Sequence, residues 1–366
     1  MDLGLFMMPL HRPEKPWSQA LAEDREAIVL AEKLGYSEAW VGEHFSTKAE
    51  QIPAPMMFFA SLLDATSTIR LGTSVVNLPH HHPIVVAAEA ALFDQLSGGR
   101  LILGIGPGGL PSDGELFGNE DMVERYGIAF ESLDVILQLW SEDAPIRIQG
   151  KHWDICMERD VWPHAGVGQF PKPLQKPHPP IAMAMIGPGG PTSEFIAERD
   201  YIPISANFVP IENVEGQQRI YREARARLGR PADLDVWRVC RSILVTESDD
   251  EARALMDDPD GTLAFYFRYL RGVRRIPEIR AMEEPSPKTL NALLEVGEAI
   301  ETCVIAGSKK TVTDRLIELV NRLGPFGTLV AAGHDWDDTH VWQDSMTTLA
   351  RDVMPIVSQH ADTLGN

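Results

Sequence analysis

The stretch that decides the fold is residues 69–109, which read IRLGTSVVNLPHHHPIVVAAEAALFDQLSGGRLILGIGPGG. Two apolar segments, Arg70–Asn77 and Leu101–Ile105, flank a helix-like segment that begins at Pro83. Parallel strands need a connection of about a dozen residues or more, and this connection is usually a helix. The pattern therefore predicts a β-α-β unit, with polar and glycine residues at the strand ends, where α/β folds bind their ligands.

The same alternation of short apolar segments and amphipathic segments runs through the rest of the chain. Strands are expected at Asp2–Phe6, Glu38–Val41, Arg70–Asn77, Leu101–Ile105, Ile181–Ile186, Tyr201–Ala206, Asp235–Val245 and Thr328–Ala332. Helices are expected at Trp17–Leu34, Ala54–Asp64, Asp121–Trp140, Glu212–Leu228, Val312–Leu323 and Val341–Val357. Eight strands with parallel-type spacing favour a closed (β/α)8 TIM barrel over an open doubly wound sheet, as a single domain over residues 1–366.

Two segments interrupt this alternation. Residues 145–180 are rich in proline, glycine and aromatic residues, and they contain a sequence that suits a hairpin, IRIQGKHWDI, before the extended PKPLQKPHPP. Residues 265–301 form an irregular tract between the last two expected strands, and a tract of this length inside a compact domain is typical of a mobile lid. We interpret the first segment as an insertion and the second as a candidate active-site lid.

The composition argues against several classes of function. The formal net charge of −20 disfavours general binding to nucleic acids or anionic membranes, both of which attract basic surfaces. No apolar run approaches the roughly 20 residues of a membrane span, and the N-terminus reaches proline too early for a signal peptide. The three cysteines, Cys156, Cys240 and Cys303, are far apart and fit a reducing compartment. We therefore expect a cytoplasmic protein.

The ends of the expected strands carry candidate site residues. His44 follows the second strand, where an imidazole that titrates near neutral pH suits a general acid or base, although a loop histidine without a chemical role also fits the sequence. Residues 187–193, GPGGPTS, lead from a strand into a helix, where backbone N–H groups favour a phosphate and a simple N-cap is the alternative. Arg125 is the best-placed cation for that anion, although a surface position is the default for an arginine.

Two further motifs do not support the sites that they first suggest. The three consecutive histidines His80–His82 point in different directions and lack companion ligands at metal-binding spacing, so no metal site is expected. The sequence GIGPGG at Gly104–Gly109 satisfies GxGxxG, but no helix begins within it, so it is not a dinucleotide-binding fingerprint. Its glycines allow either a flexible turn or the close approach of the backbone to a flat ligand.

Taken in order, these motifs resemble the bacterial luciferase-like flavin monooxygenases, particularly the alkanal, limonene and diketocamphane monooxygenases. The resemblance extends over nearly the whole chain. It is carried by Glu43-His44, GTSVVNLPHHHP, FDQLSGGRLILGIGPGG, Arg125, PLQKPHPPIAMA and SMTTLARDVMPIV. It implies a (β/α)8 barrel with an insertion and a mobile lid.

The resemblance implies a role for each matching residue near the flavin ring. His44 is the expected catalytic histidine, and a non-proline cis peptide between Ser74 and Val75 is expected to support the isoalloxazine ring. Asn77, next along that strand, is expected at the flavin edge. Gly106 stands where true luciferases carry a reactive cysteine, which leaves more room for substrate and makes light emission doubtful.

The resemblance also implies a set of contacts to the flavin phosphate. These are Arg125, Gly189, Gly190 and Thr192. Pro107 replaces a further basic contact of the family, so the phosphate is expected to depend more on Arg125 and on the turn at residues 187–192.

The activity that the resemblance implies is that of a two-component monooxygenase. A separate NAD(P)H:flavin reductase supplies reduced FMN, O2 forms a C4a-peroxyflavin, and one oxygen atom passes to a small apolar substrate such as a terpene, a cyclic ketone or an aldehyde. Members of the family usually form homodimers. Two alternatives remain, an F420-dependent hydride-transfer oxidoreductase of the same superfamily and a non-catalytic flavin-binding relative.

Overall fold

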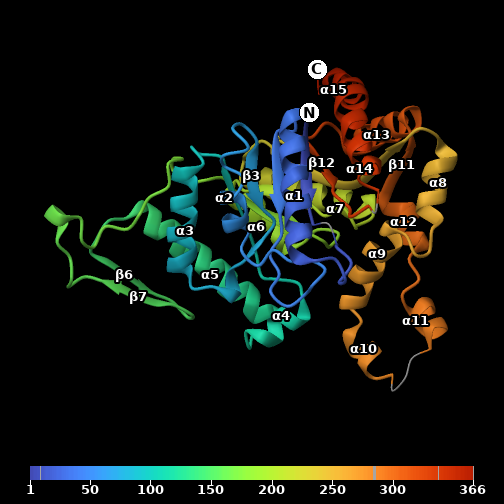
Figure 1. Cartoon of the computed structure of the whole chain (residues 1–366). Helices are drawn as coiled ribbons and strands as arrows, with labels where there is room; N and C mark the ends of the chain where they lie inside the picture. The colour runs from blue at the N-terminus through green and yellow to red at the C-terminus, as the bar shows by residue number, and fades with distance from the viewer. Residues whose placement is uncertain (9, 283–285, 337, 366) are drawn as a thin grey trace. The chain divides into compact units, whose positions relative to one another are not determined.

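The computed structural model describes residues 1–8, 10–282, 286–336 and 338–365 (Figure 1). The chain divides into two compact units. We call residues 1–39, 48–50 and 185–366 the terminal unit, and residues 40–47 and 51–184 the central unit. None of the helices in the described part of the chain is both long enough and apolar enough to cross a membrane.

The strands form one main sheet that closes on itself. Its strands are β1 (Asp2–Met7), β2 (Glu38–Val41), β3 (Arg70–Thr73), β4 (Val76–Asn77), β5 (Leu101–Gly106), β8 (Ile181–Met185), β9 (Ile202–Ser205), β10 (Arg238–Thr246), β11 (Val304–Ser308) and β12 (Thr328–Ala332). Their order is β11-β10-β12-β1-β2-β3-β5-β8-β9, and β10 also pairs with β9, which closes the ring. The pairings β1–β12, β10–β12, β10–β9, β3–β5 and β5–β8 are parallel. The fold is therefore the predicted (β/α)8 barrel.

Helices connect the strands, as the alternation in the sequence predicts. In the central unit they are α2 (Pro55–Ala60), α3 (Pro83–Leu96), α4 (Pro111–Leu116) and α5 (Met122–Ser141). In the terminal unit they are α1 (Trp17–Lys33), α6 (Pro191–Arg199), α7 (Ile211–Arg227), α8 (Asp249–Asp257), α9 (Thr262–Val273), α10 (Ile276–Arg280), α11 (Pro287–Leu293), α12 (Gly297–Cys303), α13 (Lys309–Leu323), α14 (Thr339–Thr348) and α15 (Met354–Gly365).

Two glycines let the strands of the central unit pack closely. A Cβ atom at Gly72 would lie 2.3 Å from the buried ring of Trp40, and one at Gly104 would lie 1.8 Å from the carbonyl oxygen of Thr73. The Thr73 hydroxyl donates to the Gly104 carbonyl (2.7 Å) and accepts from the Gly104 N–H (2.9 Å). These contacts fix β3 against β5 immediately before Ser74.

The structure corrects two of the strand predictions. The strand expected at Arg70–Asn77 is divided into β3 and β4, because Ser74 and Val75 leave the regular strand geometry. β11 was not predicted, and it pairs in parallel with the second half of β10. Its sequence, Val304–Ser308, is a short apolar segment that directly follows the tract interpreted as a lid.

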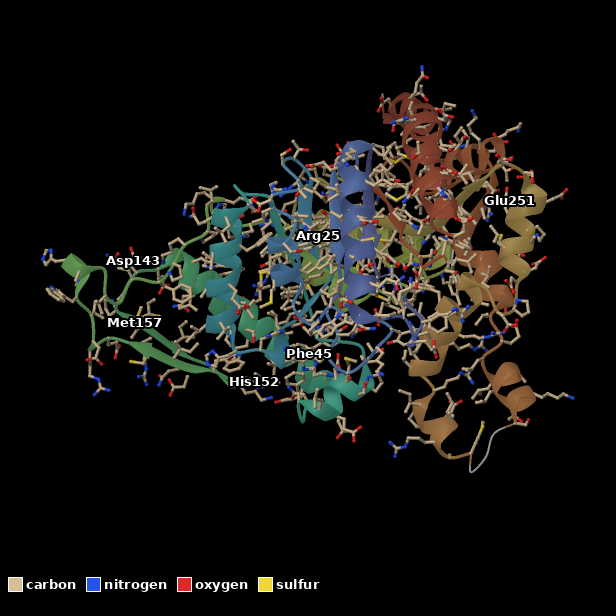
Figure 2. The ribbon with its side chains drawn as sticks, viewed as in Figure 1. Arg25, Phe45, Asp143, His152, Met157 and Glu251 are labelled. Atoms are coloured by element: carbon tan, nitrogen blue, oxygen red, sulfur yellow. The ribbon has the colours of Figure 1, made fainter. Side chains whose placement is uncertain are left out.

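The insertion at residues 145–180 contains the predicted hairpin. Strand β6 (Ile146–Gln149) pairs antiparallel with β7 (Asp154–Met157), and His152 and Met157 mark this hairpin in Figure 2. The carboxylate of Glu131, on α5, accepts the backbone N–H groups of residues 151, 152 and 153 at 2.9–3.2 Å. One side chain of the central unit therefore holds the turn of the hairpin.

The tract at residues 265–301 folds mainly into the short helices α9 to α12, and residues 283–285 lie outside the described residues. Helix α9 buries Leu263, Ala264, Tyr266 and Phe267 in the core of the terminal unit. The Tyr266 hydroxyl is hydrogen-bonded to Asn207 (2.9 Å) inside that core. The first helix of the expected lid is thus a core helix, and motion of the rest stays a prediction.

Candidate active site

His44 lies at the carboxyl end of β2 and contacts a buried carboxylate. Its Nδ1 is 3.3 Å from Oδ2 of Asp113, which is 1% exposed on the short helix α4. Asp113 also accepts the backbone N–H groups of Phe45 (3.2 Å) and Ser46 (2.9 Å) and the Ser46 hydroxyl. Figure 2 marks Phe45 within this loop. The Asp113 carboxylate therefore holds the loop after β2 against α4, and the Ser46 hydroxyl adds a hydrogen bond to that of Ser112 (2.7 Å).

The charge of Asp113 determines what it does for His44. Burial raises the pKa of Asp113, but the hydrogen bonds from His44, Ser46 and the Phe45 N–H outweigh burial and hold that pKa below its usual value. Asp113 is consequently anionic at neutral pH, accepts a proton-bearing Nδ1 of His44 and stabilises the imidazolium form. Sequence reasoning missed Asp113, and the available signal was its position shortly after the glycine motif, beyond Leu110, Pro111 and Ser112.

The peptide bond between Ser74 and Val75 is cis, as the family resemblance implied. On the neighbouring strand, Gly106 is paired with Asn77, and a Cβ atom at Gly106 would lie 2.8 Å from the Val75 side chain. A side chain at residue 106 would therefore displace the side chain of Val75.

Asn77 is 3% exposed and donates two hydrogen bonds to Glu43, one to its side chain and one to its backbone. Its backbone N–H donates to Oε2 of Glu43 (2.8 Å), and its side-chain Nδ2 donates to the backbone oxygen of Glu43 (2.8 Å). The side-chain amide of Asn77 thus links the ends of β4 and β2.

Arg125 lies in the first turns of α5 and is 4% exposed. Its Nη1 donates to the backbone oxygen of Gly108 (3.3 Å), and its buried Nε has no hydrogen-bond partner among the described residues. Gly108 has φ +80°, a left-handed conformation that favours glycine, and it leaves space next to His80. The sequence singled out Arg125 as the candidate cation for a phosphate, with a surface position as the alternative, and the structure places it buried beside the glycine motif.

The three histidines of residues 80–82 make three different kinds of contact. The ring of His80 stacks on that of Phe117, with 4.5 Å between the ring centroids. Burial lowers the pKa of His80 to about 4. Asp113 opposes this shift, whereas Arg125, His81 and His44 add to it. Nε2 of His81 lies 3.0 Å from Oε1 of Glu43. His82 precedes α3, and its Nδ1 accepts the N–H of Ile84 (3.3 Å).

The expected phosphate turn lies in the terminal unit. Gly189 (φ 103°) and Gly190 (φ 148°) lead into α6. Gly190 is the N-cap residue of α6 and has no side chain that could cap the helix. Gly189 lies against α7, because a Cβ atom there would be 2.8 Å from the backbone oxygen of Gly216. Thr192 occupies the first turn of α6. The central unit therefore brings together His44, Ser74, Val75, Asn77, Gly106 and Arg125, and the terminal unit brings together Gly189, Gly190 and Thr192.

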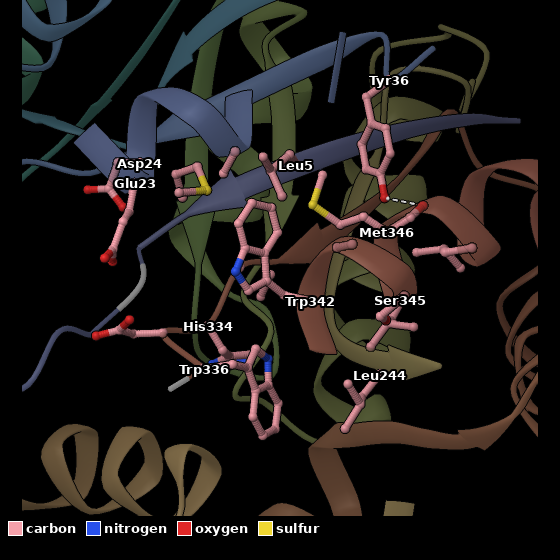
Figure 3. A pocket seen from close by; sticks show the side chains of 18 of the residues that line it. Leu5, Glu23, Asp24, Tyr36, Leu244, His334, Trp336, Trp342, Ser345 and Met346 are labelled. Atoms are coloured by element: carbon pink, nitrogen blue, oxygen red, sulfur yellow. Dashed lines mark hydrogen bonds between the residues drawn. The ribbon is translucent and has the colours of Figure 1, made fainter. Parts of the chain in front are cut away.

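The terminal unit also contains a cavity of about 60 Å³, lined by β1, α1, β12 and α14 (Figure 3). His11 lies there between Asp24 (3.1 Å) and Asp335 (2.9 Å). Lys15 bonds to both Glu23 and Asp335. Burial lowers the pKa of His11, but the hydrogen bonds to Asp24 and Asp335 outweigh it and raise this pKa to about 9. The cluster is therefore an internally paired ion network.

Comparison with known proteins shows what the chain is similar to. Residues 1–325 match the family model described as luciferase-like monooxygenase. The chain is 30% identical to 4-hydroxyprotoasukamycin monooxygenase of Streptomyces nodosus subsp. asukaensis, over 97% of this chain and 92% of that protein. It is 28% identical to limonene 1,2-monooxygenase of Rhodococcus erythropolis, over 97% and 86% of the two chains.

The fold matches a solved structure from the same group of enzymes. This structure is the oxygenating constituent of 3,6-diketocamphane monooxygenase from Pseudomonas putida, described as a type II Baeyer-Villiger monooxygenase in complex with FMN. The TM-score is 0.83 at 24% identity, and the match covers 97% of this chain and 98% of the other. From the extent of these matches, the chain belongs to the family of luciferase-like monooxygenases.

Proposed function

We propose that this chain is the oxygenase component of a two-component, FMN-dependent monooxygenase. It uses reduced FMN from a separate NAD(P)H:flavin reductase, together with O2, to oxygenate a small apolar substrate such as a terpene, a cyclic ketone or an aldehyde. The observation that carries the proposal is the His44–Asp113 pair at the end of a strand. The chain that contains this pair is similar to monooxygenases along almost its whole length. Two of these relatives are named after limonene and diketocamphane, and these names support the substrate class.

The donor groups in each unit suit FMN. In the central unit, the Nε of Arg125 has no hydrogen-bond partner among the described residues, so this cation suits a phosphate. Gly106 has no side chain beside Val75, which suits a flat ring there. In the terminal unit, the uncapped start of α6, with Gly190 and Thr192, offers backbone N–H groups and a hydroxyl to an anion. An FMN relative of known structure supports the same cofactor.

The residues of the central unit would control proton transfer and water. Reduced FMN, when bound, supplies the electrons that activate O2. His44, oriented by Asp113, would hold or move a proton at the nitrogen that faces away from the carboxylate. The rings of Phe45 and Phe117, 4.9 Å apart beside His44, would exclude water from that proton.

Replacing His44 tests the catalytic part of the proposal. We expect His44→Ala to bind reduced FMN with nearly the wild-type affinity, to form no oxygenated product and to release hydrogen peroxide instead. Product formation and peroxide release are measured with a flavin reductase and a panel of terpenes, ketones and aldehydes. Unchanged product formation in the variant removes His44 from the mechanism.

Cofactor titration tests the rest of the proposal. We expect tight binding of reduced FMN and weak binding of F420, because the longer anionic tail of F420 needs more cations. Tight binding of F420 without binding of reduced FMN would replace the proposal by F420-dependent hydride transfer. Binding of reduced FMN without product from any substrate would favour the non-catalytic alternative. We also propose a cytoplasmic homodimer, and its mass in sedimentation experiments tests the oligomeric state.

A further inference from the structure

Glu43 is a buried carboxylate that directly precedes His44 in the chain. It is 3% exposed, and both its side chain and its backbone oxygen are used by Asn77, at 2.8 Å each. Because Asn77 donates one of these hydrogen bonds to the carboxylate and the other to the backbone oxygen of Glu43, a shift of the Glu43 carboxylate would disturb the position of Asn77 and the backbone before His44 together. The state of the Glu43 carboxylate therefore matters for two residues of the candidate site.

His81 contacts this carboxylate from the other side. Its Nε2 lies 3.0 Å from Oε1 and 3.1 Å from Oε2 of Glu43, so the ring faces both oxygens. The His81 ring is 24% exposed, whereas the Glu43 side chain is 2% exposed. A buried carboxylate is costly unless it is paired with a charge or with strong donors. His81 is thus placed to neutralise Glu43 while it stays in contact with solvent protons.

The groups around His81 favour its charged form. Burial lowers the pKa of His81, but the hydrogen bond to Glu43 and the charges of Glu43 and Glu89 outweigh burial and raise this pKa. The adjacent His80, whose pKa is lowered to about 4, is neutral at pH 7 and does not repel a cationic His81. His81 and Phe45 are also in ring contact, 5.8 Å between centroids, next to His44.

We propose that His81 is a positioning residue of the active site, whose cationic ring holds the Glu43 carboxylate and, through it, the backbone of His44 and the amide of Asn77. This inference rests on the proposed function, in which His44 handles a proton. In this proposal the positive charge of His81 contributes to catalysis in addition to its hydrogen bond to Glu43. When His81 loses its proton, Glu43 keeps a neutral donor but loses its counter-charge, so we expect the turnover number to fall and ligand binding to change little.

The test uses the full chain with reduced FMN, a flavin reductase and a substrate that gives product. The values of kcat and KM are measured across pH 6–9.5 for the wild type, His81→Gln, Glu43→Gln and the double variant. We expect His81→Gln to lower kcat by about tenfold at pH 7 and to change KM less than about threefold. We also expect kcat of the wild type to fall at high pH, and this fall to be absent in His81→Gln.

Glu43→Gln separates the charge from the hydrogen bond. An amide at residue 43 needs no counter-charge, so the double variant is expected to regain part of the activity lost in His81→Gln. His152→Gln is the matched control, since His152 of the same unit also lies beside glutamates, Glu124 (3.5 Å) and Glu131 (3.9 Å), but does not contact Glu43. A wild-type pH profile in His81→Gln, or an equal loss in His152→Gln, overturns the inference.

A measurement without turnover keeps the inference testable if no substrate gives product. In protein labelled with ¹⁵N-histidine, the His44 ring signals of the wild type should shift as His81 titrates, and they should not shift over that pH range in His81→Gln. Absence of product from the wild type would contradict the proposed function. Identical His44 titration curves in the two proteins would contradict the positioning role of His81.

Discussion

The hydrogen bond from His44 to Asp113 sets which nitrogen of the imidazole carries a proton. In Asp113→Asn an amide oxygen still accepts this hydrogen bond, but the negative charge that stabilises the imidazolium form is lost. We expect kcat to fall by about 10- to 100-fold while the affinity for FMN changes little.

Asp121→Asn is the control for the charge change. Asp121 caps α5 through the N–H groups of Val123 and Glu124, and asparagine is an equally good N-cap. Stopped-flow product formation compares both variants with the wild type. Equal rates in Asp113→Asn and the wild type would show that the charge of Asp113 is not needed.

His11 makes the stability of the terminal unit depend on pH. The pKa of His11 is raised from its ordinary value of 6.5 to about 9 in the folded protein, so its contribution to stability is complete below pH 6.5 and is lost as the pH rises through 9. We expect the free energy of unfolding to fall over this range by up to about 3 kcal/mol. Urea denaturation at several pH values measures the slope, which should be smaller in His11→Asn. The same slope in both proteins would exclude His11 as its source.

Single residues could be predicted where position in an element decides their role. His44 follows a strand, and its place at the strand end was predicted correctly. Its partner Asp113 is 69 residues away, and no local pattern tells which carboxylate the folded loop will meet. The same holds for Glu43 and His81, which are 38 residues apart. Whether Arg125 is exposed or buried likewise depends on the folded structure around it, which no local sequence pattern shows.

At the level of elements, the packing of β3 on β5 depends on the absence of a side chain at Gly104. In Gly104→Ala the new Cβ would lie 1.8 Å from the backbone oxygen of Thr73, so one of the two strands must move. We expect a loss of roughly 1–3 kcal/mol in the free energy of unfolding. Gly109→Ala is the control, because a Cβ there meets nothing within 4 Å. Equal thermal midpoints for the two variants would contradict this packing argument.

Most strands were predicted because a buried parallel strand is a short apolar segment between helices. β11 was missed for the opposite reason, since its five residues follow an irregular tract and no turn signal separates them from it. The tract itself was interpreted from its irregular sequence, whereas the apolar residues of α9 pack in the core. Apolar residues in an irregular tract can cover a site or build a core, and sequence spacing does not distinguish the two.

For the molecule as a whole, the proposed function requires a partner that delivers electrons. We expect the purified chain to consume no O2 with NAD(P)H and FMN alone, and to form product when a flavin reductase from any source is added. The reductase without the chain is the control for free peroxide formation. Oxygenated product from the chain and NAD(P)H without a reductase would contradict the two-component assignment.

The fold class was accessible from the whole sequence because many weak signals agree in order along the chain. No single motif was sufficient: the glycine motif and the three histidines each suggest a different site when they are considered alone. Eight apolar segments with helical connections, by contrast, leave few alternatives to a closed parallel barrel.

The hairpin β6–β7 has a consequence for how this chain can diversify. Glu131 holds its turn through three main-chain N–H groups, and such contacts do not depend on which side chains the hairpin carries. Gly150 is one exception, because a Cβ there would lie 1.9 Å from the Glu131 carboxylate. Trp153, whose indole N–H donates to Ser132 (2.9 Å), and the buried Ile146 and Ile155 are others. At its remaining positions the hairpin can exchange recognition sequences, by evolution or by design, without rebuilding the barrel that carries it.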